Sequence, residues 1–171
     1  MTFEQLKALF QSYTGVGDTE VEDIELALWF NEAQLELAYD FGEVGSLAVS
    51  NTALPADYLN TVKVSNSNGM VGYEITPDGN IISNTDATLY YRKYPTDFTG
   101  LDLSAESALP EAVHYLMAIF AASRYWDKES EGDGEESNHA NKWMGYFMNG
   151  KQNALKKLSL GGAKPKYWTV V

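Results

Sequence analysis

The stretch that decides the fold reads LALWFNEAQLELAYDF (residues 26–41). Its apolar residues recur at helical spacing, and one face of the expected helix carries Leu26, Phe30, Ala33, Leu37 and Phe41. A second apolar face carries Ile24, Leu28, Leu35 and Tyr39. Acidic residues precede the stretch, as the positive end of a helix dipole favours. We therefore expect a long helix that starts at Asp18 or Thr19, runs to about Phe41 and is ended by Gly42.

The remaining stripe of this helix is acidic with a tryptophan in its middle, and its members are Glu22, Glu25, Trp29, Glu32, Glu36 and Asp40. Two interpretations stay open for Trp29. Its ring can lean sideways over the protein's own core, or it can anchor a neighbouring subunit, because tryptophan is enriched at interface hot spots.

Helices are also expected on both sides of this segment. Thr2 can cap a first helix over Phe3–Ser12, which the glycines in residues 15–17 end. Pro110 opens a third helix that continues through Trp126, and residues 112–123 of it are apolar nearly all round. A fourth helix is expected over residues 137–158, with an inward stripe of Trp143, Phe147, Ala154 and Leu158.

Short β-prone runs separate the second helix from the third: residues 46–50, 61–65, 71–76, 80–83 and 87–94. The turn Pro77-Asp78-Gly79-Asn80 suits a tight hairpin. No crossover helix lies between the runs, so we expect one small antiparallel sheet of about four or five strands.

The fold class expected from this order is α+β: a bundle of about four helices with a small antiparallel β-sheet inserted between helices 2 and 3. Residues 1–160 form one domain, in which 46–95 are the β insertion. Residues 161–171 form an extended C-terminal tail, which begins with two glycines and ends in YWTVV.

Composition excludes several kinds of protein. The formal net charge is −12, which makes a grip on the phosphate backbone of nucleic acid a poor expectation. There is no cysteine, and therefore no disulfide, no thiolate metal site and no cysteine nucleophile. The first residues, MTFEQ, lack the basic and apolar regions of a signal peptide, and no apolar run is long enough to span a bilayer, so we expect no secretion signal and no membrane segment.

No catalytic motif stands out, and we expect neither an enzyme nor a bound cofactor. The two histidines, His114 and His139, have no paired-ligand spacing, and His114 is expected to be a hydrogen-bonded core residue. The best metal candidate is the acidic loop over residues 127–138, whose first half resembles a calcium loop. Position twelve of that loop is Asn138, which cannot bind bidentately as glutamate does, so we assign no metal site.

The chain resembles the head-to-tail adaptor (head-completion) proteins of tailed bacteriophages. The resemblance rests on the helix LALWFNEAQLELA (26–38), on LPADYL (54–59), on the strand LYYRKYP (89–95), and on LPE (109–111) leading into the third helix. The resemblance spans roughly residues 20–158. It rests on the order of the elements and on the general residue pattern, and no diagnostic motif supports it.

The resemblance implies a structural protein of the virion neck, made in the host cytoplasm. It would form a ring, typically of twelve copies, beneath the portal protein, with a tail, stopper or terminator protein on its other side. Double-stranded DNA would pass through without specific binding, and an acidic wall suits such passage. The acidic stripe with Trp29 is then a candidate channel face or subunit interface, and Asp78 and Asp86 of the β insertion are another candidate for the channel.

Adaptors of this kind often dock on the portal through a C-terminal segment. The candidate docking residues are the basic and apolar members of the tail, Lys164, Lys166, Tyr167, Trp168, Val170 and Val171. The tail can instead pack back on its own domain. The alternatives to an adaptor are another neck or tail completion protein, or a calcium-binding interaction module built on the acidic loop.

Overall fold

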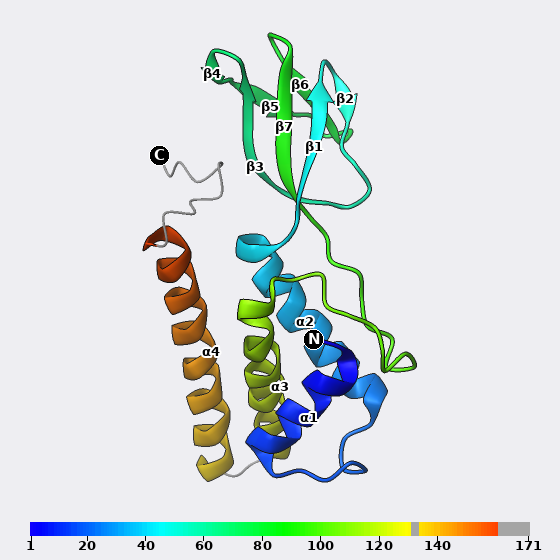
Figure 1. The fold of residues 1–171 in the computed structure, drawn as a ribbon, viewed down its shortest axis with the longest axis vertical. Coiled ribbons are helices and arrows are strands. Elements are labelled where there is room, and N and C mark those ends of the chain that lie inside the picture. Colours follow the sequence, from blue (N-terminus) through cyan, green and yellow to red (C-terminus); the bar gives the residue numbers. More distant parts are fainter. Residues whose placement is uncertain (131–133, 161–171) are drawn as a thin grey trace.

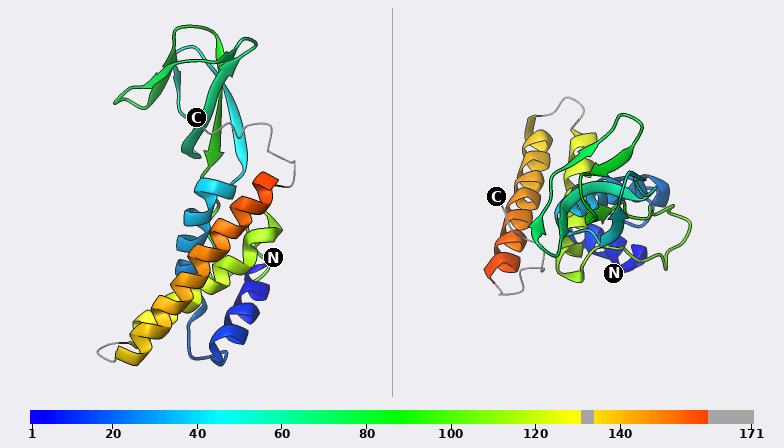
Figure 2. Two further views of the ribbon diagram at one scale, coloured as in Figure 1. Left: turned by 90° about the vertical axis from the view of Figure 1, so that its left-hand side faces the viewer. Right: turned by 90° about the horizontal axis from the view of Figure 1, so that it is seen from above.

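The computed structural model of the chain describes residues 1–130 and 134–160. Four helices form a bundle at one end of an elongated molecule, and a β unit stands on the other end (Figures 1 and 2). The element order is α1 (Phe3–Thr14), α2 (Asp23–Phe41), strands β1–β7, α3 (His114–Glu129) and α4 (Gly134–Leu160). The predicted α+β class, with the sheet region inserted between the second and third helices, is confirmed.

The first helix forms where its sequence places a reciprocal cap. The Gln5 amide donates to Thr2 Oγ1 at 3.3 Å, and the Thr2 amide donates to Gln5 Oε1 at 3.0 Å. The helix ends at Thr14, two residues later than expected, and Gly15 caps it with a φ of +74°, which suits a residue without a side chain.

The predicted start of α2 at Asp18 or Thr19 is wrong, because the helix begins at Asp23. Asp18 is held by the first helix instead: Gln11 Nε2 donates to its carboxylate at 2.6 Å, and Lys7 lies 3.5 Å away. Val16 and Val21 on either side are buried. The chain therefore turns inward here to bury both valines before the helix starts.

The apolar face of α2 forms the core of the bundle, with Leu26, Phe30, Ala33 and Leu37 almost fully buried. Helix α3 lies centrally and packs against α1, α2 and α4. It is preceded by a single 3₁₀ turn over Glu111–Val113 and runs three residues beyond Trp126.

The fourth helix is longer than predicted, and its inward stripe differs at one residue. Phe147 is 1% exposed, and Trp143 and Ala154 pack against the core as expected, but Leu158 is 39% exposed. Gly150 of α4 lies against Tyr115 and Leu116 at the start of α3. The last turns of α4 thus extend past the start of α3, and Leu158 there remains exposed.

The β unit contains two small antiparallel sheets rather than the single predicted sheet. One has the strand order β1-β7-β3-β4, with β1 Val44–Val49, β3 Tyr58–Asn66, β4 Gly69–Met70 and β7 Ala87–Lys93. The other has the order β2-β6-β5, with β2 Thr52–Ala53, β5 Tyr73–Ile75 and β6 Asn80–Ser83. The run expected over 71–76 is shortened to Tyr73–Ile75, because the chain leaves the first sheet after Met70 and joins the second at Tyr73. The β5–β6 hairpin around Gly79 is confirmed.

The β unit has a hydrophobic core of its own, formed by Val49, Val64, Ile81, Ala87, Leu89 and Tyr91. Arg92, the next residue of β7, joins this unit to the bundle. Its guanidinium donates to the backbone carbonyls of Gly42 at 2.6 Å and Asp40 at 2.8 Å, so it caps the C-terminal end of α2. The side chain is 7% exposed, and burial lowers the pKa of Arg92 from its ordinary value.

His114 is buried and hydrogen-bonded, as predicted for a core residue. Its Nε2 lies 2.7 Å from the carbonyl of Leu109, and its Nδ1 lies 2.8 Å from the amino group of Met1. Burial lowers the pKa of this imidazole below its ordinary value of 6.5.

The depressed pKa of His114 predicts a loss of stability in mild acid. The folded state prefers the neutral ring, so the stabilisation is complete above pH 6.5 and declines as the pH falls from there toward the folded-state pKa. One such group contributes at most about 1.4 kcal/mol per pH unit. Urea unfolding midpoints between pH 7.5 and pH 5 should show a shallower decline for His114→Gln than for the parent protein. Replacement of the exposed His139 by glutamine is the matched control for the loss of a histidine; equal slopes for the parent protein and His114→Gln would contradict the prediction.

Candidate interaction surface

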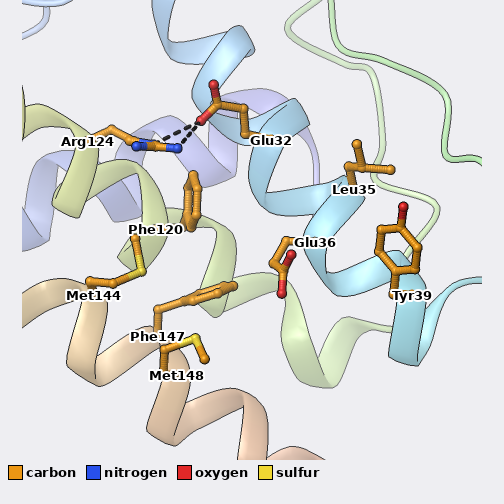
Figure 3. A pocket seen from close by; sticks show the side chains of 9 residues that line it. All are labelled: Glu32, Leu35, Glu36, Tyr39, Phe120, Arg124, Met144, Phe147 and Met148. Carbon is orange, nitrogen blue, oxygen red and sulfur yellow. Dashed lines mark hydrogen bonds and ion pairs between the residues drawn. The ribbon is translucent and has the colours of Figure 1, made fainter.

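A groove lies between α2 and α4, with α3 as its floor (Figure 3). Its volume is about 360 Å³, within the range of pockets that hold ligand groups. The lining is mainly apolar: Leu35 and Tyr39 from α2, Phe120 from α3, and Met144, Phe147 and Met148 from α4. Tyr39 and Met148 are each 47% exposed, so this apolar surface is accessible from solvent.

Ion pairs bridge the helices along this groove. Arg124 of α3 binds Glu32 of α2 through two nitrogens, each 2.9 Å from Glu32 Oε2. Lys151 of α4 lies 2.7 Å from Glu36 and 3.0 Å from Asp40. Burial lowers the pKa of Lys151, but its hydrogen bonds to the two carboxylates and their charges outweigh that effect, so its pKa lies above the ordinary value. The groove therefore combines an apolar floor with charged groups from α2, α3 and α4.

A second accessible apolar surface, here called the lateral patch, consists of Ile24, Leu28 and Leu101. Their exposed fractions are 57%, 59% and 82%. The connector after β7 brings Leu101 close to α2, because a Cβ placed on Gly100 would lie 2.9 Å from the Cα of Ile24. Exposed apolar residues gathered in this way mark surfaces that other proteins cover.

The structure pairs most of the acidic stripe within the subunit. Glu25 lies 2.8 Å from Lys128, Glu32 binds Arg124, and Glu36 binds Lys151. Glu22 is exposed. Hydrogen bonding to Glu25 raises the pKa of Lys128 above its ordinary value. The cations that pair with the stripe come from α3 and α4, so much of it faces those helices.

Trp29 lies over the protein's own core. It is half-buried, and its ring centroid is 6.2 Å from that of Phe10. This is the position expected if the ring leans sideways over the core. Part of the Trp29 ring is exposed, and its contact with a neighbouring subunit stays a prediction.

The six tail residues proposed for portal docking lie outside the described residues. The same holds for Glu131, Gly132 and Asp133 of the acidic loop. Among residues 1–130 and 134–160, no group of three or more His, Asp or Glu side chains could hold a metal ion. In the same part of the chain, no helix combines the length and hydropathy needed to cross a membrane.

The lateral patch and the lining of the groove include residues that sequence reasoning did not select as site residues. Leu101 sits in a connector without periodicity, and Met144 and Met148 read as neighbours of the inward stripe. Arg124 and Lys128 carried a usable signal. They lie four residues apart on a mostly apolar helix, which places both cations on one face of it.

No protein-family model matches the chain, and no curated protein matches it.

Proposed function

We propose that this protein is a structural head-to-tail adaptor of a tailed bacteriophage. Several copies assemble side by side into a ring beneath the portal, extend the DNA channel and provide the platform for the tail or stopper protein. The order of elements supports the proposal, since the resemblance rests on two helices, a β insertion and two further helices, and the chain folds in that order.

The observation that carries the proposal is the lateral patch, formed by α2 and the connector after β7. Ile24 and Leu28 lie one turn apart on α2, and both expose more than half of their surface. Single exposed leucines are ordinary, but two apolar residues in a row on a helix with a third apolar residue, Leu101, beside them favour burial by another subunit. An elongated subunit with such a side is suited to lateral assembly around a ring.

Direct location tests the assignment. Particles from the native source are labelled with an antibody against this protein and imaged by electron microscopy. Label at the neck, between capsid and tail, is the expected result. Particles that lack the protein, or label on the capsid shell or the distal tail, would contradict the assignment.

Deletion of residues 161–171 is expected to weaken binding to the portal protein of the same phage at least 100-fold, about 3 kcal/mol. The reason is that Tyr167 and Trp168 are the aromatic residues of the tail, and aromatic anchors dominate binding energy. Binding is measured as the dissociation constant for the portal protein immobilised on a sensor surface. The control is Lys164→Ala/Lys166→Ala, which removes charge and keeps the aromatic residues, and should weaken binding less. Circular dichroism verifies that the deletion leaves the fold intact; equal binding by the shortened chain would contradict the docking role.

A further inference from the structure

The groove between α2 and α4 has the chemistry of a site for aromatic side chains. Met144 and Met148 supply flexible thioethers, which make favourable contacts with aromatic rings, and Phe120 and Phe147 supply the floor (Figure 3). Arg124 lies over the Phe120 ring at 5.0 Å. Because Phe147 is 1% exposed and Met148 is 47% exposed, the floor is fixed while one wall can adapt to an occupant.

The groove also lies beside an excess of negative charge. At the groove, α2 contributes three carboxylates, Glu32, Glu36 and Asp40, and they pair with two cations, Arg124 and Lys151. One negative charge is left over. An occupant with positive charge beside its apolar residues would match this surface.

Residues 161–171 have this combination. They contain two lysines and no acidic residue, and the lysines are followed at once by Tyr167 and Trp168. The rest of the chain contains all 24 acidic residues. Charge complementarity therefore favours residues 161–171, among the segments of this chain, as the occupant of the groove.

The chain length permits the contact. Met148 lies twelve residues before Leu160, where α4 ends, a distance of about 18 Å along a helix. Trp168 lies eight residues beyond Leu160, which an extended chain spans in about 26 Å. Gly161 and Gly162 permit the reversal of direction that a return along α4 requires.

We propose that, in the free protein, Tyr167 and Trp168 occupy the groove between α2 and α4 of their own chain. The inference goes beyond the adaptor assignment and does not depend on it, since it concerns the isolated protein. If the assignment also holds, docking of the tail on a portal first requires its release from the groove, so that the free subunit is kept from binding prematurely.

Methionine-methyl NMR on the full chain with a spin label in the tail tests the inference. The chain lacks cysteine, so Thr169→Cys gives a single labelling position. The methyl signals of Met144 and Met148 should lose most of their intensity, and should recover when the label is reduced. The signal of Met70, in the β unit, is the internal reference and should keep its intensity.

Two further samples separate the possible occupants. In a mixture of isotope-labelled protein without the spin label and unlabelled spin-labelled protein, the Met144 and Met148 signals should stay intact. Loss of intensity in that mixture would mean that a second copy's tail fills the groove, and would overturn the intramolecular proposal. Met148→Glu, at an exposed position, should restore the Met144 signal in the spin-labelled chain with the circular dichroism spectrum unchanged. Full signals for both methionines in the spin-labelled chain itself would leave the groove to a different partner and overturn the proposal.

Discussion

Replacement of Arg92 by methionine is expected to lower the free energy of unfolding by about 3 kcal/mol, and the melting temperature by roughly 6–12 °C. The guanidinium donates to two backbone carbonyls at the end of α2, and methionine leaves both without this partner. An acceptor left unsatisfied in a buried place costs about 1–3 kcal/mol. Relief from burying a charge offsets part of the loss. Thermal and urea unfolding, followed by circular dichroism, give both values.

Methionine is chosen because it keeps the apolar stem of Arg92, so that the loss reports the guanidinium contacts rather than a cavity. Arg92→Lys should fall between the parent and Arg92→Met, since a single ammonium cannot bind both carbonyls in the fork geometry of a guanidinium. Lys93→Met is the matched control on the same strand. The Lys93 ammonium pairs with Glu43 at 2.7 Å on the surface, where water screens the pair, and its removal should change stability much less than Arg92→Met does. Equal effects of Arg92→Met and Lys93→Met would show that Arg92 does not join the two parts.

The parts of this fold that were predictable from sequence are those with long periodic patterns. Helix α4 spans 27 residues, and its register around Phe147 follows from spacing alone. The two-residue strands β2 and β4 were missed, because two residues carry no alternation to detect. Their pairing depends on turns and on neighbouring strands.

Contacts between segments that lie far apart in the sequence were the other feature that could not be predicted. Asn31 and Gln34 lie within the predicted helical stretch 26–41, yet their side chains bind the connector after β7. The Asn31 side chain exchanges hydrogen bonds with the backbone of Phe98 at 2.7 and 2.9 Å, and Gln34 donates to the Thr96 carbonyl at 2.8 Å. Gln34 is fully buried. Helical spacing places these two amides next to the core face but gives no information about a partner more than 60 residues away.

The two candidate surfaces could not be predicted from the sequence for the same reason. The spacing identified Ile24, Leu28, Leu35 and Tyr39 as a second apolar face, and the structure divides these residues between the lateral patch and the groove. The division depends on α4, which covers the α3 side of the bundle and leaves a groove beside α2 (Figures 1 and 3). A pattern within one helix cannot show how far a neighbouring helix covers it.

Two glycines of α4 are expected to respond to alanine with opposite signs. Gly145 and Gly150 are both interior helical residues, where glycine costs about 1 kcal/mol relative to alanine. A Cβ on Gly145 would meet no atom within 4 Å, so Gly145→Ala should raise the free energy of unfolding by about 0.5–1 kcal/mol. A Cβ on Gly150 would lie 2.4 Å from Leu116 Cδ2 and 3.3 Å from the Tyr115 hydroxyl.

Leu116 is fully buried, so its side chain cannot move out into solvent to make room. Gly150→Ala should therefore force α4 away from α3 and lower the free energy of unfolding by about 1–3 kcal/mol, despite the gain in helix propensity. The two glycines are matched in helix, in type and in substitution, so the difference between the variants isolates the close approach of α4 to α3. Urea unfolding of both variants measures it. A stabilising effect of Gly150→Ala equal to that of Gly145→Ala would show that α4 packs less closely on α3 than the structure has it, and the groove between α2 and α4 would then be wider as well.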